Sequence, residues 1–342
     1  MSTVTHPRPA SRAGSSDRPV LSVENLRVEY HTGRGIAQAV NGVSFSVAAG
    51  EKLAIVGESG CGKTATLLAA LRLLPEPPSK TVAGSVRVDG VDLLSVDRTT
   101  LNEVRGRDVS IVFQDALSAF NPVLTVGRQI AEGAKQQRKL NKREAHQLAV
   151  DMLEKVGVPD PDQRAKQYPH QLSGGMRQRA MIAMALAGNP KVLFADEPTT
   201  ALDVTVQAQI LDLVRSFEDL AIVWVSHDLG VVAGLADRVI VMYSGYVVEE
   251  GTVTDIFHRP QHPYTAALLA SVPKADAADA GADLASIPGS PPDLINLPAG
   301  CPFAERCPVR VDRCTQERPQ LMRMTATQTV SCWVAQGEEE QL

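Results

Sequence analysis

The feature that most constrains this chain is a glycine-rich segment that joins two regular elements. Its residues are Gly57-Glu58-Ser59-Gly60-Cys61-Gly62-Lys63-Thr64. The apolar run 52–56 before it is typical of a buried strand, and the run 65–74 after it is typical of a helix. Glycines in such a strand–loop–helix connection let consecutive backbone N–H groups turn inward, where they bind phosphate oxygens. The segment therefore predicts a phosphate-binding loop in an α/β protein.

The side chains at the end of this loop indicate which phosphate ligand it binds. The Lys63 ammonium suits the β- and γ-phosphates of a nucleotide, and the Thr64 hydroxyl suits Mg²⁺. The side chain of Cys61 is not required, because the backbone does the binding. A glycine-rich turn without a ligand is the alternative, and the flanking strand and helix argue against it. The predicted nucleotide contacts here are Gly57, Ser59, Gly60, Cys61, Gly62, Lys63, Thr64 and Thr66.

A second apolar run, 192–195, is followed by two acidic residues and is typical of a strand buried in a parallel sheet. Asp196 can hold Mg²⁺, and Glu197 can polarise an attacking water as a general base. Two adjacent acids at a strand end can also be a solvated turn. The phosphate loop upstream favours the catalytic interpretation.

Two further polar residues follow predicted strands. Gln114 ends the run 109–113, where it can contact Mg²⁺ or the attacking water. His227 follows the strand 222–225, where its imidazole can contact a γ-phosphate. A single glutamine is more often a surface residue and a single histidine more often structural. The functional interpretation of both residues is favoured because they occur together with the other motifs. The segment 200–203 completes this set of motifs.

A second glycine pair, Leu172-Ser173-Gly174-Gly175-Met176, begins a predicted helix over 174–188. Free N–H groups at a helix start form an anion site, so Ser173, Gly174 and Gly175 are predicted nucleotide contacts. One nucleotide does not need two such sites from one chain. This site is therefore expected to serve the ATP of a neighbouring chain; an ordinary helix start is the alternative.

In order along the chain, these segments resemble the Walker A, Q-loop, signature, Walker B, D-loop and H-loop of the ATP-binding-cassette (ABC) superfamily, over about 21–256. The resemblance implies an α/β nucleotide-binding domain with a RecA-like parallel sheet core, an antiparallel β subdomain, and a helical signature subdomain at about 115–185. It also implies a head-to-tail dimer that sandwiches two ATP molecules and includes Asp203 of the D-loop. Tyr30 then resembles the aromatic residue that stacks on adenine, although a core strand residue is the alternative.

The composition becomes rich in proline after residue 256. Segments 259–265, 287–289 and 300–307 resemble the C-terminal extension of dipeptide/oligopeptide/nickel importer ATPases. The signature ends in Met176 instead of the more usual Gln, which resembles the D-type subunit of those importers. The domains expected are a disordered tail over 1–19, the nucleotide-binding domain over 20–256 and the extension over 257–342.

The resemblance also implies the partners. A second, related ATPase is expected in a heterodimer in preference to a homodimer, under two transmembrane permeases that an extracytoplasmic solute-binding protein supplies. The chain would be the ATP-hydrolysing translocase subunit that energises import of peptides or related solutes. The alternative is a soluble ABC ATPase of the repair or translation type, and neither a long coiled-coil insertion nor a second cassette is present in the sequence.

Four cysteines gather near the C-terminus in the spacing C-x5-C-x6-C-x17-C: Cys301, Cys307, Cys314 and Cys332. Four thiolates can hold a [4Fe–4S] cluster, and resemblance to the importer family supports this assignment. Structural zinc usually shows closely spaced cysteine pairs, which this tail does not have. Zinc and free or oxidised thiols remain the alternatives.

The charge and the hydropathy of the sequence indicate where the protein is located and whether it binds nucleic acid. The formal net charge is -5, so the sequence does not have the excess of basic residues that is typical of nucleic-acid-binding proteins. The longest apolar zone, 221–243, contains His227, Asp228, Asp237 and Arg238, which a lipid-facing helix does not tolerate cheaply. No secretory signal opens the chain. A peripheral protein on the cytoplasmic face of the inner membrane is therefore expected.

Overall fold

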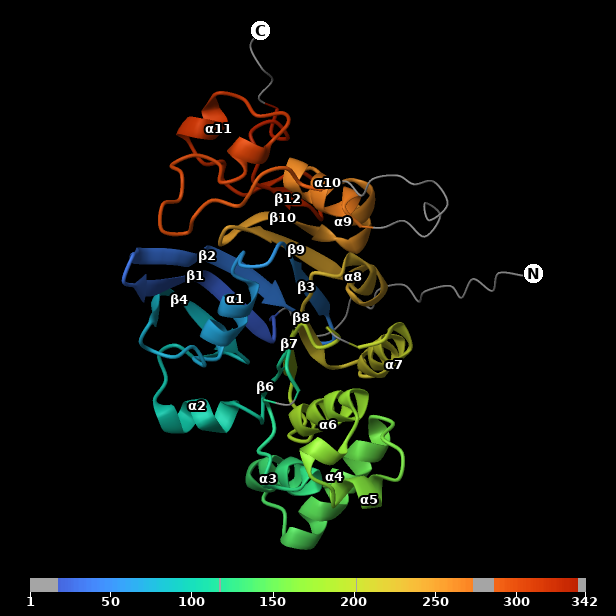
Figure 1. Cartoon of the computed structure of the whole chain (residues 1–342). Coiled ribbons are helices and arrows are strands. Elements are labelled where there is room, and N and C mark those ends of the chain that lie inside the picture. The colour runs from blue at the N-terminus through green and yellow to red at the C-terminus, as the bar shows by residue number, and fades with distance from the viewer. Residues whose placement is uncertain (1–17, 117, 201, 273–285, 338–342) are drawn as a thin grey trace, which may run out of the picture.

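The computed structural model describes residues 18–116, 118–200, 202–272 and 286–337 (Figure 1). The disordered tail predicted over 1–19 lies outside the described residues, apart from its last two positions.

Within these residues the structure is built on an eight-stranded sheet with the order β11-β12-β10-β9-β3-β8-β7-β6. The five strands from β9 to β6 are parallel, and β10, β12 and β11 continue the sheet antiparallel. The strands are β3 (Lys52–Val56), β6 (Val109–Val112), β7 (Val192–Asp196), β8 (Ala221–Val225), β9 (Arg238–Tyr243), β10 (Tyr246–Thr252), β11 (Met322–Arg323) and β12 (Thr329–Val330).

Every residue of β3, β7 and β8 is buried, because both faces of the sheet are covered. On one face, Ile55 and Phe194 pack against α1 (Lys63–Ala70) and the second sheet. On the other face, Leu193 packs against the helical region and Val56 against helices near the C-terminus. The carboxyl ends of these parallel strands meet at one edge, where ligands bind in open α/β sheets.

The second sheet is antiparallel and has the order β2-β1-β4-β5 in the part of the chain described. It consists of β1 (Leu21–Thr32), β2 (Gly35–Val47), β4 (Ser79–Val88) and β5 (Val91–Asp92). Alternate residues of β1, such as Leu21 and Val23, are buried in the core that this sheet shares with α1. The predicted antiparallel β subdomain is confirmed.

A helical region lies at the opposite end of the molecule from the C-terminal lobe (Figure 1). It contains α3 (Val126–Arg138), α4 (Lys142–Lys155), α5 (Pro161–Ala165) and α6 (Gly174–Leu186), which share one hydrophobic cluster. Asn141 and Glu144 form a capping box that starts α4. The predicted α/β cassette with a helical subdomain is confirmed.

The remaining helices surround the two sheets. They are α2 (Arg98–Val104), α7 (Val204–Arg215), α8 (Leu229–Leu235), α9 (Val253–His258), α10 (Pro263–Ala270) and α11 (Arg313–Gln316), with 3-10 turns at Pro169–Gln171 and Ala304–Arg306. Among the described residues, none of these helices combines the length and apolar character needed to cross a membrane.

The C-terminal segment, described over residues 257–272 and 286–337, continues the central sheet. Glu249 of β10 pairs with Val330 of β12. The Glu249 carboxylate is fully buried and accepts hydrogen bonds from the Gln261 N–H at 2.8 Å, the His262 N–H at 3.0 Å and the Gln328 amide at 2.8 Å. A buried carboxylate with three donors ties the segments on both sides of the gap at 273–285 to the same strand.

His262 lies at the N-cap of α10, 1% exposed, and its Nδ1 accepts the Tyr264 N–H at 3.0 Å. Burial lowers the pKa of His262 to about 3 from 6.5. As the pH falls below the unfolded value, the unfolded chain binds this proton and the folded chain does not. His262 therefore removes stability as the pH falls between these two values.

We expect the substitution His262→Asn to reduce this pH dependence, because Asn keeps an N-cap acceptor and does not titrate. The wild-type free energy of unfolding should fall by about 2 kcal/mol more than that of the variant between pH 7 and pH 5. Urea unfolding at the two pH values measures the difference. An equal fall in the free energy of unfolding of the two proteins would show that His262 is not the source of this pH dependence.

Candidate active site

The glycine-rich loop is held tightly between two strands. Gly57 has φ +151° and Gly62 has φ +105°, in the region that favours glycine. A Cβ at Gly57 would overlap the carbonyl oxygen of Met242 on β9, and a Cβ at Gly62 would overlap that of Ala39 on β2. The glycines therefore allow the close approach that fixes the loop at the end of β3.

Lys63 is 5% exposed and its ammonium points back into the loop. Its Nζ donates to the Gly57 carbonyl at 2.7 Å and to the Glu58 carbonyl at 3.0 Å. The loop thus holds a buried positive charge next to the end of β3. This arrangement suits the phosphates of a nucleotide.

Thr64 and Asp196 connect the loop to the end of β7. The Thr64 hydroxyl donates to Asp196 Oδ1 at 2.9 Å. Asp196 is 5% exposed, and burial raises the pKa of its carboxyl. A hydroxyl and a carboxylate side by side are the hard oxygen ligands that Mg²⁺ prefers, so these residues fit the predicted ion.

Glu197 is the point on which the other predicted catalytic residues converge. Its Oε2 accepts from the Gln114 amide at 3.1 Å and from the Thr200 hydroxyl at 3.1 Å, and it lies 3.1 Å from His227 Nδ1. Glu197 has φ +45°, a conformation that is unusual for a side chain of this size. The sequence analysis did not assign Thr200 to this contact.

These residues line a pocket with a volume of about 670 Å³. Tyr30, the residue predicted to stack on adenine, lines it together with Ala37 and Ala39. Leu294 also lines the pocket and comes from the C-terminal segment, which the sequence analysis did not connect to the nucleotide. The other lining residues are Ser59, Gly60, Gly62, Lys63, Thr64, Ala65, Gln114, Glu197, Thr200 and His227.

Besides Asp196, two predicted contacts have buried side chains that do not line this pocket in the described structure. Thr66 is fully buried and its hydroxyl donates to the Gly62 carbonyl at 2.8 Å. Cys61 is 4% exposed, and burial raises the pKa of its thiol. Thr66 lies on the inner face of α1, where its hydroxyl is already satisfied by the preceding turn. Any contribution of these two positions comes through the backbone.

The signature segment lies beside the residues that follow Glu197. Ser173 caps α6 by accepting the Met176 N–H at 3.3 Å, and a Cβ on Gly175 would lie 3.1 Å from Val206 of α7. Asp203 caps α7 through the Val206 N–H at 2.9 Å. In the described structure, Ser173, Gly174 and Gly175 do not line the nucleotide pocket of their own chain.

The four C-terminal cysteines lie in one neighbourhood. The Cys301 N–H donates to the Cys314 carbonyl at 2.7 Å. Burial, with smaller contributions from the Cys314, Cys332 and Cys307 thiols, raises the pKa of the Cys301 thiol to about 12. Burial also raises the pKa values of Cys307 and Cys332.

The predicted [4Fe–4S] cluster is not supported by this arrangement. Among the described residues, no group of three or more His, Cys, Asp or Glu side chains is placed to hold a metal ion.

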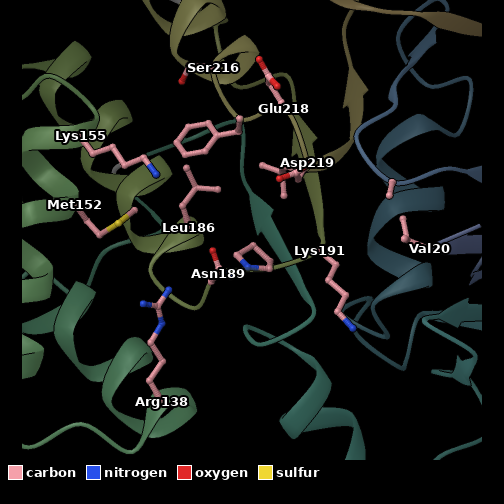
Figure 2. Close-up of a pocket in the computed structure, with 14 residues that line it drawn as sticks. Val20, Arg138, Met152, Lys155, Leu186, Asn189, Lys191, Ser216, Glu218 and Asp219 are labelled. Carbon is pink, nitrogen blue, oxygen red and sulfur yellow. The ribbon is translucent and has the colours of Figure 1, made fainter. Parts of the chain in front are cut away.

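A larger pocket, of about 810 Å³, lies at the opposite edge of the sheet, beside the amino ends of β7 and β8 (Figure 2). Arg138 and Met152 of the helical region line one side, and Glu218 and Asp219 line the other. Lys155 Nζ lies 4.5 Å from the centre of the Phe217 ring. None of the residues predicted to bind nucleotide is among the described residues that line it.

Known proteins match nearly the whole chain. It is 49% identical over 324 residues to the dipeptide transport ATP-binding protein DppD of Bacillus subtilis, covering 94% of this chain and 96% of that protein. It is 46% identical to the oligopeptide transport ATP-binding protein OppD of Bacillus subtilis, covering 92% and 88%. Among solved structures, a post-hydrolysis dimer of the ATP-binding cassette MJ0796 with ADP and Pi matches with a TM-score of 0.62 and 28% identity, over 68% of this chain and 98% of that one.

Two family models match separate parts of the chain. The model described as ABC transporter matches residues 40–200, which contain the glycine-rich loop, the signature and Glu197. The model described as oligopeptide/dipeptide transporter, C-terminal region, matches residues 248–314. The chain therefore belongs to the ABC transporter family, as an ABC ATPase that carries the C-terminal region of the oligopeptide/dipeptide transporters.

Proposed function

We propose that this chain is the ATP-hydrolysing subunit that energises an ABC importer for peptides or related solutes. The observation that carries the proposal is the convergence of Gln114, Thr200 and His227 on Glu197 beside the phosphate loop. The names of the relatives, which concern dipeptide and oligopeptide transport, favour an importer over a soluble repair or translation ATPase. We also propose the division into a nucleotide-binding domain at 20–256 and an extension at 257–342, which the second family match supports.

We propose the following roles for the residues of the pocket. Loop N–H groups and Lys63 bind the phosphates, Tyr30 stacks on the adenine, and Glu197 orients and deprotonates the attacking water. Gln114 and His227 hold the Glu197 carboxylate in place and lie close enough to contact the water and the γ-phosphate. Thr64, Asp196 and Gln114 would hold Mg²⁺ together with the nucleotide, and the ion would neutralise charge on the phosphates.

The substitution Glu197→Gln tests the general base, because the amide keeps the size of the side chain and cannot take a proton. We expect the variant to bind Mg-ATP as the wild type does and to lose about 10²- to 10⁴-fold in hydrolysis rate in the transporter complex. Glu218→Gln, an exposed change at the other pocket, is the matched control. Hydrolysis by Glu197→Gln at the control rate would show that another group is the base.

We propose that hydrolysis needs a second cassette, whose signature segment completes the site. Two observations support this: Ser173, Gly174 and Gly175 do not line their own described pocket, and Val204, next to Asp203, is 80% exposed. The similar solved cassette MJ0796 is a dimer. Following the D-type resemblance of Met176, we propose a heterodimer with a related ATPase, placed under two permeases on the cytoplasmic face of the inner membrane. A solute-binding protein would deliver the solute from outside.

Co-purification tests these partners. The affinity-tagged Glu197→Gln chain, expressed from its own locus and extracted in detergent with ATP, should retain two membrane permeases and one non-identical cassette subunit, identified by mass spectrometry. Recovery with only a second copy of itself would contradict the heterodimer. Recovery with nucleic acid or ribosomes instead of permeases would contradict the transport function.

The [4Fe–4S] cluster at Cys301, Cys307, Cys314 and Cys332 stays a prediction, which rests on the spacing of these cysteines and on the resemblance of the extension to that of the importer family. If it is right, protein purified without oxygen should contain about four iron and four sulfide ions per chain. Stoichiometric zinc without sulfide would favour the zinc alternative. The absence of both would leave free or oxidised thiols.

A further inference from the structure

The C-terminal segment contacts the phosphate loop through Arg306. This arginine ends the 3-10 turn Ala304–Arg306, and its side chain is 5% exposed. Its two terminal nitrogens donate to the two carboxylate oxygens of Glu58, at 2.7 Å and 2.9 Å. Paired hydrogen bonds between a guanidinium and a carboxylate fix the relative orientation of both groups. The second residue of the glycine-rich loop is therefore held by a residue far from it in the sequence.

The main chain of Glu58 is held as well. Its N–H donates at 2.8 Å to the hydroxyl of Tyr264, which is fully buried on α10. Arg306 also donates to the Tyr243 hydroxyl at 3.1 Å. The rings of Tyr243, Tyr264 and Phe303 pack together with centres 4.6 to 5.4 Å apart, which keeps both hydroxyls in place.

The position of Glu58 bears directly on the phosphate site. It stands between Gly57 and Ser59, and its carbonyl is one of the two that accept from the Lys63 ammonium. A displacement of Glu58 would move an acceptor of that ammonium and the N–H groups that follow. Glycine allows many backbone conformations, so contacts from outside the loop restrict the conformation that its backbone adopts.

A second contact reaches the other end of the nucleotide pocket. The Leu294 carbonyl accepts the Gln38 N–H of β2 at 2.9 Å, and Asp293 pairs with Arg34 at 3.3 Å. Leu294 lines the pocket beside Tyr30. In Figure 1 the orange-red segment that includes these residues descends from the C-terminal lobe toward the strands β1 and β2.

From these contacts we infer that the C-terminal segment contributes to nucleotide binding by positioning the phosphate loop and by lining the pocket. Arg306 and Tyr264 are positioning residues that fix the phosphate loop through Glu58, and Leu294 is a wall of the pocket at the base and ribose end. The inference deepens the proposed function and rests on nucleotide binding at this pocket. The competing explanation is that the segment only adds stability to the fold.

The first test measures the dissociation constant of the full-length chain for Mg-ATP and for inorganic triphosphate, which has no base or ribose. Arg306→Met should raise the dissociation constants for both ligands by about tenfold, because the loop that binds phosphate is no longer held. Arg323→Met, an exposed arginine of the same segment, is the control and should leave both unchanged.

A double-mutant cycle separates loop positioning from general stability. Glu58→Gln should weaken triphosphate binding, and the pair Glu58→Gln with Arg306→Met should be no weaker than the worse single variant, because both changes break one contact. Independent additive losses would contradict a direct role of the pair. If Arg306→Met does not fold, Arg306→Lys keeps the charge without the paired geometry and should show an intermediate loss.

Leu294→Ala tests the wall of the pocket. It should weaken Mg-ATP by about three- to tenfold, as expected for a truncated apolar contact, and leave triphosphate binding unchanged. Leu321→Ala, a 42% exposed leucine in the same segment, is the control. If Leu294→Ala weakens the binding of both ligands, the substitution disturbs the whole site and does not remove a contact with the nucleoside alone.

The outcomes also separate this inference from the proposed function. If folded Arg306→Met and Leu294→Ala bind both ligands as the wild type does, the inference is wrong and the proposed function stands. If the wild-type chain itself binds no Mg-ATP, the proposed function is wrong.

Discussion

The parallel pairing of β3, β8 and β7 is the constraint on which the rest of the site depends. Val225 at the end of β8 pairs with Ile55 on one side and with Asp196 on the other. This register brings the loop after β3, the acidic pair at the end of β7 and the histidine after β8 to one edge. The contact of His227 with Glu197 joins the ends of the neighbouring strands β8 and β7, and the hydrogen bond from Thr64 to Asp196 joins the segment after β3 to the end of β7, across the end of β8.

The same edge concentrates charge that the fold has to stabilise locally. Lys63 and Asp196 are each 5% exposed, and both are satisfied by hydrogen bonds from within the loop or across it. Burying an unpaired charge is costly, so these partners are part of the stability of the empty site as well as of its function. An incoming nucleotide would exchange the loop carbonyls around Lys63 for phosphate oxygens.

The C-terminal segment is joined to this framework at three places. Its strand β12 extends the sheet at β10, Arg306 pairs with Glu58, and Leu294 bonds to β2. Each contact is to a different part of the nucleotide-binding fold: the sheet edge, the phosphate loop and the antiparallel sheet. The segment therefore contacts the phosphate loop through Arg306 and lines the pocket through Leu294, although it contains none of the motifs that identify the ATPase.

Much of the fold and most of the site followed from local sequence. Continuous apolar runs predicted the buried strands, and the glycine-rich loop predicted the phosphate site, because period and glycine placement are local properties of the chain. Gln114, Glu197 and His227 could be placed together because each follows a strand of one parallel sheet. Local signals of this kind do not report which face of a helix is buried, so the inward direction of the Thr66 side chain was missed.

The sequence by itself determined the strands, the order of the motifs and the chemistry that their residues can perform. Only the tertiary structure decided that Arg306 meets Glu58, that Leu294 lines the pocket and that the signature does not reach its own chain's pocket within the described residues. The same holds for the cysteines, whose spacing suggested a cluster that the described arrangement does not support. The physical reason is that such contacts join residues far apart in the chain. Their formation depends on how the segments between them pack, which no local pattern records.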